Sequence, residues 1–69
     1  DVLNGGLGDD QLAGGVGDDT FYAGMGNDHI DGEDGSDSVS GEDGVDTIFG
    51  GAGADYLYGG EGDDVINGD

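Results

Sequence analysis

A strict period of nine residues runs through this chain of 69 residues, and it limits the possible folds more than any other feature. Counted from Gly5, the sequence divides into seven complete units over residues 5–67, with partial units at both ends. No insertion interrupts the register, so each unit is expected to repeat the same local structure. We therefore expect residues 1–69 to form one repetitive domain and, since both ends fall inside the pattern, to be a segment of a larger protein.

Three positions of the unit are constrained. Position 4 is always glycine, position 6 is always aspartate, and position 8 always carries an apolar side chain. Glycine at fixed positions allows φ > 0 and tight turning, while the alternation at positions 7 to 9 suits a very short strand with one buried side chain. Each unit is therefore predicted to be a turn followed by a short strand. Two units complete a circuit, so equivalent loops recur every 18 residues along each edge and position 8 faces inward.

The charge composition requires a cation from outside the chain. There are 18 acidic residues, no lysine and no arginine, and the formal net charge is −18. A glycine-rich, acidic chain is normally disordered, because it buries little apolar surface and its carboxylates repel each other. A disordered linker does not, however, keep an apolar residue in every ninth position. The same composition excludes nucleic acid as a partner, since no basic residue could neutralise phosphate, and no apolar run approaches the ~20 residues that span a membrane.

Stacked circuits would place the position-6 aspartates in two rows, one along each edge. Neighbours in a row would lie ~4.8 Å apart, where carboxylates repel each other unless a cation lies between them. Hard oxygen ligands favour calcium over magnesium, and transition metals would need His or Cys, of which only His29 exists. The six same-edge pairs predict about five to seven calcium ions. The rows are Asp10, Asp28, Asp46 and Asp64 on one edge and Asp1, Asp19, Asp37 and Asp55 on the other.

These residues resemble the RTX (repeats-in-toxin) nonapeptide, G-G-x-G-x-D-x-U-x, and the resemblance covers the entire chain. It implies an all-β fold, a right-handed parallel β-roll (β-solenoid) with two nonapeptides per turn and calcium between successive loops. By the same resemblance, the position-6 carboxylates bind metal together with backbone carbonyls of loop residues near positions 1, 2 and 4. The expected carbonyl ligands are Gly6, Gly8, Gly15, Gly17, Gly24, Gly26, Glu33, Gly35, Glu42, Gly44, Gly51, Gly53, Gly60 and Gly62.

Two central units depart from this pattern. Glu33 and Glu42 occupy position 2, where a carbonyl can still bind metal but a glutamate is strained if the position needs φ > 0. Position 5 varies to Ser36, Val45 and Ala54, so its side chain is not expected to be a required ligand.

The remaining residues indicate no catalytic site. The chain has neither the spacing of an EF-hand nor a phosphate-binding glycine motif, and His29 falls at an outward-facing position. One outer sheet face would carry Thr20, Tyr22, Ser38, Ser40, Tyr56 and Tyr58, and the other Gln11, His29, Thr47 and Phe49. The tyrosine face could bind sugars or another protein, although aromatic residues also simply favour strands.

The resemblance implies a calcium-binding module and not an enzyme. Such a module would be disordered without Ca²⁺, leave a Gram-negative cell by type I secretion, and fold outside it, where it would stabilise an attached domain or aid its secretion. Two alternatives remain open. The chain could be a carbohydrate-binding module, or a structural or adhesive extracellular module that self-associates end to end into filaments or a surface layer.

Overall fold

The computed structural model describes residues 1–68, and its regular secondary structure consists of eight strands of three residues each. Each strand occupies positions 7 to 9 of its unit, as the alternating pattern predicts. Residues 1–68 include no helix long and apolar enough to cross a membrane. In chain order the strands are β1 (Val2–Asn4), β2 (Gln11–Ala13), β3 (Thr20–Tyr22), β4 (His29–Asp31), β5 (Ser38–Ser40), β6 (Thr47–Phe49), β7 (Tyr56–Tyr58) and β8 (Val65–Asn67).

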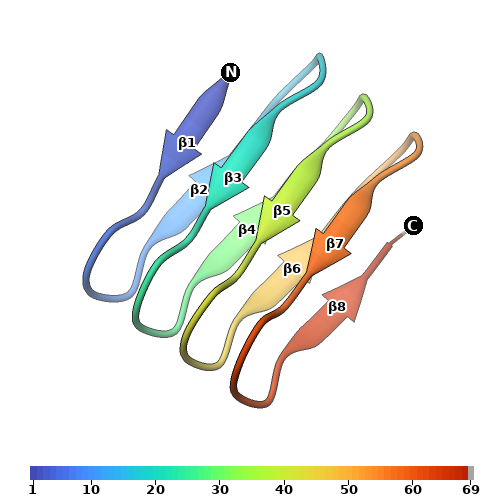
Figure 1. Ribbon diagram of the computed structural model, residues 1–69. Helices are drawn as coiled ribbons and strands as arrows, with labels where there is room; N and C mark the ends of the chain where they lie inside the picture. Colours follow the sequence, from blue (N-terminus) through green and yellow to red (C-terminus); the bar gives the residue numbers. More distant parts are fainter. Residues whose placement is uncertain (69) are drawn as a thin grey trace.

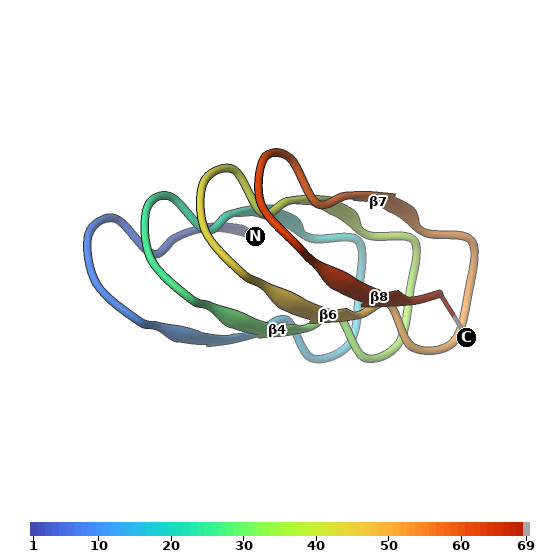
Figure 2. The same ribbon diagram turned by 90° about the horizontal axis from the view of Figure 1, so that it is seen from below.

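The strands form two parallel sheets that the chain visits alternately. Odd-numbered strands form the sheet β1-β3-β5-β7, and even-numbered strands form the sheet β2-β4-β6-β8. Every pairing joins residues two units apart, so that Leu3 pairs with Phe21 and Leu12 with Ile30. The chain winds as a right-handed coil (Figure 1), and the two sheets lie as separate layers joined by loops at both edges (Figure 2). The fold is therefore the predicted all-β parallel β-solenoid with two nonapeptides per turn.

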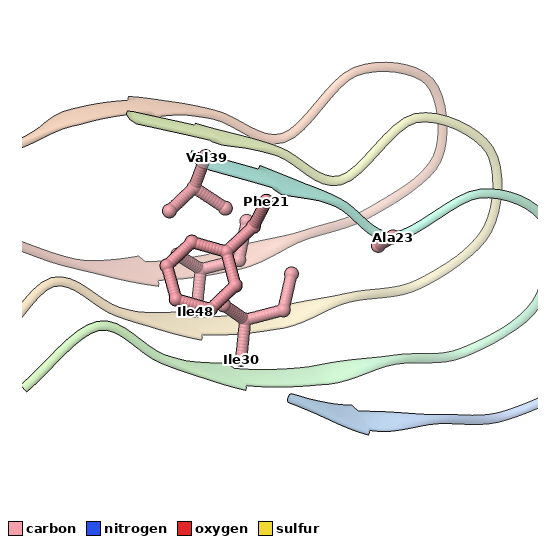
Figure 3. Packing of buried hydrophobic residues seen from close by; sticks show 5 residues of the cluster. All are labelled: Phe21, Ala23, Ile30, Val39 and Ile48. Atoms are coloured by element: carbon pink, nitrogen blue, oxygen red, sulfur yellow. The ribbon is translucent and has the colours of Figure 1, made fainter. Parts of the chain in front are cut away.

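The core consists of the position-8 side chains that both sheets direct into the space between them (Figure 3). Ile66, on the last strand, is 46% exposed, so the core is covered in the middle of the roll and open at that end. Ala23 at position 1 is also fully buried, a contribution that the position-8 pattern did not predict. The buried position-8 residues are Phe21, Ile30, Val39 and Ile48, with Leu3, Leu12 and Leu57 packed against them.

Glycine is required at position 4 of the loops for two separate reasons. The position-4 glycines have φ between 90° and 122°, a region that residues with side chains rarely adopt. In addition, a Cβ on Gly44 would collide with the carbonyl oxygen of Gly26 in the preceding turn. Position 2 also has positive φ, and Glu33 and Glu42 adopt values of 68° and 66° there. These two glutamates are therefore held in a strained backbone conformation.

Positions 7 and 9 point outward, as the sequence predicted. On the β1-β3-β5-β7 sheet, Ser40 pairs with Tyr22 on one side and Tyr58 on the other, while Tyr56 pairs with Ser38. All three tyrosines are exposed. On the opposite sheet His29 is exposed and its ring lies against that of Phe49, with ring centroids 5.5 Å apart. His29 therefore lies on an outer sheet face, with its ring against Phe49.

Candidate metal sites along the two loop edges

The position-6 aspartates form two rows, one along each loop edge, and hydrogen bonds join successive members of each row. The backbone N–H of one aspartate donates a hydrogen bond to Oδ1 of the aspartate 18 residues later. Each bond spans two successive loops of the same edge, so Oδ1 holds neighbouring turns together. The donor–acceptor pairs are Asp10–Asp28, Asp19–Asp37 and Asp46–Asp64 at 2.8 Å, and Asp28–Asp46 and Asp37–Asp55 at 2.9 Å.

The second carboxylate oxygen of these residues has no partner in the protein. Within residues 1–68, six position-6 aspartates have an Oδ2 that is buried and accepts no hydrogen bond. Buried polar atoms are nearly always hydrogen-bonded, and leaving one unpaired is strongly unfavourable, above all when the group is charged. A row of such oxygens is what a set of cation sites requires. The six are Asp10, Asp19, Asp28, Asp37, Asp46 and Asp55.

In the units that begin with glycine, the position-6 Oδ2 is directed toward that glycine, and at Gly5, Gly14, Gly32 and Gly41 a carbonyl oxygen of the next turn converges on the same point. A Cβ built on Gly41 would lie 2.6 Å from Asp46 Oδ2 and 2.7 Å from the carbonyl oxygen of Gly59 in the next turn. On the other edge, a Cβ on Gly32 would lie 2.6 Å from Asp37 Oδ2 and 2.7 Å from the Gly50 carbonyl oxygen. Gly32 and Gly41 thus leave open a point that oxygens of two loops approach at close to calcium–oxygen distance.

The same geometry is present at both edges of the first turn. A Cβ on Gly14 would lie 2.6 Å from Asp19 Oδ2 and 3.0 Å from the Gly32 carbonyl oxygen. The resemblance implied carbonyls near positions 1, 2 and 4, although the residues named for it were those of positions 2 and 4; at Gly14, Gly32 and Gly41 the carbonyl that approaches Oδ2 is a position-1 carbonyl of the next turn. The signal in the sequence was the glycine that occupies position 1 in every unit except the one that begins at Ala23.

The expected carbonyl ligands of positions 2 and 4 line the same loops. At position 2, the carbonyls of Gly6 and Gly15 accept bonds of 3.0 and 3.2 Å from the next turn, from the N–H groups of Met25 and Asp34. At position 4 the glycines stack directly, and the carbonyl oxygen of each fills the space where a Cβ of the next would lie. The loops therefore bring carbonyl oxygens of successive turns together at the edges that carry the aspartate rows.

Burial makes the ionised form of these aspartates unfavourable. The pKa of Asp46 is raised to about 6, chiefly by burial and also by the neighbouring carboxylates of Asp28 and Asp64, while the hydrogen bond from the Asp28 N–H lowers it. Burial also raises the pKa of Asp37. The hydrogen bond from the Asp19 N–H lowers this pKa, and the surrounding carboxylates raise it. A cation beside Oδ2 would reverse both effects, since it favours the ionised form and offsets the loss of hydration.

The two ends of the rows differ from their middle. The Asp1 side chain is 91% exposed, and its α-amino group, not its carboxylate, contacts the row at 2.7 Å from Asp19 Oδ1. Asp64 accepts the bond from Asp46 but is only partly buried. Within residues 1–68 no three His, Cys, Asp or Glu side chains converge on one point, so each site would combine carboxylate and carbonyl oxygens. Such an all-oxygen donor set fits calcium.

Comparison with known families agrees with this donor chemistry. A family model described as RTX calcium-binding nonapeptide repeat (4 copies) matches residues 4–39, 14–48 and 40–69. Comparisons with individual curated proteins and with solved structures find no match. The matched stretches together run from residue 4 to residue 69 and contain the loops of both edges.

Proposed function

The chain belongs to the family of RTX calcium-binding nonapeptide repeats, and we propose that it is a module that folds only when calcium binds between successive loops. The observation that carries this proposal is the set of six buried Oδ2 atoms without a partner. Burial of these unpaired oxygens destabilises the folded state when no cation is bound. A cation between each pair of loops would remove that cost. In this proposal the repeats adopt their folded structure only when calcium is bound.

Each site would be built by two loops of one edge. In the site between residues 41–46 and 59–64, Asp46 would supply Oδ2 and Gly59 a carbonyl oxygen, with the position-2 and position-4 carbonyls completing the set. Bound calcium would supply the positive charge that this chain lacks. Asp46 Oδ1 meanwhile accepts the Asp28 N–H, which orients the carboxylate and leaves Oδ2 free for the metal.

The core is too small to fold this chain unaided. Among residues 1–68 five apolar side chains are buried, and a chain of this size rarely gains enough from such a core without a metal or disulfide. The structure has no cysteine. About six calcium ions, within the proposed range of five to seven, would carry about 12 positive charges against a net charge of −18. The metal would therefore act on the folding equilibrium directly.

Calcium-dependent folding suggests where the chain works. RTX repeats are typical of secreted proteins, and calcium is abundant outside cells and scarce inside them. We propose that the chain stays unfolded in the cytosol, passes unfolded through a type I secretion apparatus, and folds on reaching extracellular calcium. There it would stabilise an attached domain of a larger protein, or aid its secretion.

A calcium titration followed by far-UV circular dichroism tests the proposal, with magnesium as the control. We expect a steep transition from coil to β-structure with calcium alone, and isothermal calorimetry to count about five to seven ions. Dynamic light scattering on the same samples would show whether folded rolls associate end to end. A chain that is equally folded in calcium and in chelator would contradict the proposal, as would an equal response to magnesium.

A second candidate function rests on the outer face of the β1-β3-β5-β7 sheet. In a chain with a net charge of −18, the eight outward positions of this sheet carry no charged side chain. Tyr22 and Tyr58 lie in one register row, two strands apart, with Ser40 between them. An uncharged tyrosine and hydroxyl surface suits a neutral sugar chain better than an acidic one. Binding of calcium-folded protein to neutral glycans on an array, lost when Tyr22, Tyr56 and Tyr58 are all alanine, would support this function.

A further inference from the structure

The position-5 side chains join adjacent loops in the direction opposite to the position-6 aspartates. Between residues 23–28 and 41–46, the Asp28 N–H donates forward to Asp46 Oδ1 at 2.9 Å. In the same loop pair the Val45 N–H donates backward to Asn27 Oδ1 at 3.0 Å. The two bonds come from adjacent residues and run in opposite directions, so together they fix the separation of the two loops. We call this arrangement a reciprocal clamp.

Only part of the roll carries this clamp. In the first loop pair, the Asp10 N–H donates to Asp28 Oδ1 and the Asn27 N–H to Asp9 Oδ1, both at 2.8 Å. The first pair on the other edge is clamped alike, by bonds of 2.8 Å from Asp19 to Asp37 and from Ser36 to Asp18. With the pair described above, three loop pairs have a reciprocal clamp.

The two loop pairs nearest the C-terminus have the forward side-chain bond but no position-5 bond. Asp37 donates to Asp55, and Asp46 donates to Asp64, but within residues 1–68 no position-5 side chain accepts a backward bond in these pairs. Backbone bonds also join them, among them one of 3.0 Å from the Glu61 N–H to the Glu42 carbonyl oxygen. The reason is the residue at position 5 of the earlier loop. Val45 has no acceptor for the Asp63 N–H, and the shorter Ser36 side chain accepts no bond from Ala54. The variation at position 5 therefore divides the roll into a part with reciprocal clamps and a part with the forward side-chain bond but no position-5 bond.

The clamp acts on the gap in which the metal would lie. Position 5 stands between the position-4 carbonyl and the position-6 carboxylate, so a bond at this residue fixes the spacing of both ligands in adjacent loops. We propose that Asp9, Asp18 and Asn27 are positioning residues that hold their loop pairs at the spacing calcium needs. This inference rests on the proposed calcium-dependent folding. Loop pairs with a clamp then bind calcium at lower concentrations, because hydrogen bonds already hold their loops in place. The two C-terminal pairs bind last, because calcium must supply more of the free energy that orders their loops.

Two substitutions that leave the net charge unchanged test the clamp, one by adding a position-5 acceptor and the other by removing one. Val45→Asn gives the 41–46 loop an acceptor for the Asp63 N–H, and Asn27→Val removes the acceptor used by Val45. Ala54→Asn is the matched control, because it adds the same amide at position 5 of a loop that no later loop of residues 1–68 follows on its edge. Amide hydrogen exchange by NMR is read at residues 63 and 45 during a calcium titration.

Val45→Asn is expected to slow exchange of the Asp63 amide and to raise the folding equilibrium constant at fixed calcium about fivefold. Asn27→Val is expected to speed exchange at Val45 and to shift the titration the other way, while Ala54→Asn leaves both unchanged. If the wild-type chain folds on calcium but Val45→Asn leaves the Asp63 amide and the titration as they were, the clamp is wrong and the proposed function stands. A wild-type chain with no calcium-dependent protection would overturn both.

Discussion

Asp46→Asn should have opposite effects on folding in the absence and in the presence of calcium. Asp46 is fully buried, and its pKa rises from 3.8 to about 6 on folding, mainly through burial. A shift of that size makes the ionised residue unfavourable by about 3 kcal/mol in the folded chain. Asparagine has nearly the same shape, keeps an oxygen for the Asp28 N–H, and has no charge to bury. Without calcium the variant should therefore fold more easily at pH 7, by up to about 3 kcal/mol.

The sign of the pH dependence follows from the same shift. Between pH 3.8 and about 6 the folded chain binds a proton at Asp46 that the unfolded chain has lost. Calcium-free folding of the wild type therefore weakens as pH rises through this window, and the full penalty remains above it. Asp46→Asn should show a pH dependence that is shallower by about one proton. With calcium the effect reverses, because the variant lacks a charged ligand at the centre of its row and should lose up to about two ions.

Two assays separate these effects. Folding induced by a stabilising osmolyte in chelator, followed by circular dichroism from pH 4 to 7, measures the calcium-free part. A calcium titration at pH 7 with calorimetry measures the affinity and the number of ions. Asp63→Asn is the control, since it removes the same charge from an exposed neighbour. If Asp46→Asn behaves like this control in chelator, burial does not penalise the carboxylate, and if it binds as many ions as the wild type, Asp46 is not a shared ligand.

Three further substitutions test the loops, each followed by calcium titration and circular dichroism. Gly44→Ala should destabilise the folded chain by about 3 kcal/mol or more, because the alanine would have positive φ and its Cβ would collide with Gly26. Gly8→Ala should destabilise it less, because nothing lies within 4 Å of a Cβ at that position. Glu42→Gly should stabilise the folded chain by about 1 kcal/mol by relieving its φ of 66°; equal stabilisation by Glu61→Gln would assign the gain to charge instead. Gly41→Ala should raise the calcium midpoint and remove about one ion, because its methyl would lie 2.6 Å from Asp46 Oδ2; an unchanged ion count would place the metal elsewhere.

The strands and the aspartate rows were predictable because repetition turns a local pattern into a tertiary one. Alternation at positions 7 to 9 defines a strand, and an uninterrupted period forces strands two units apart into register. The rows follow from that register alone, as the bond from Asp28 to Asp46 shows. The strain at Glu33 and Glu42 was also visible, on the condition that position 2 has positive φ, which the structure meets.

The role of position 5 was not predictable in the same way. It depends on where loop atoms lie relative to the next turn, and that is set by the positive φ values at positions 2 and 4. The variation to Ser36, Val45 and Ala54 argued against a required ligand role for the side chain, which stays a prediction. It could not show that Asn27 instead accepts a hydrogen bond from a backbone N–H 18 residues later.

The two oxygens of one carboxylate explain why the module needs both its fold and its metal. Oδ1 of Asp46 satisfies a backbone N–H of the preceding turn, so the residue contributes to stacking whether or not it is charged. Oδ2 of Asp46 has no hydrogen-bond partner among residues 1–68, so the ionised residue opposes the same stacking until a cation binds. An asparagine at every position 6 would keep the hydrogen bond between turns but would lack the charged oxygen. Such a chain would fold without depending on calcium. Aspartate at position 6 therefore makes the folded state dependent on calcium, and hydrogen bonding alone would not require the charge.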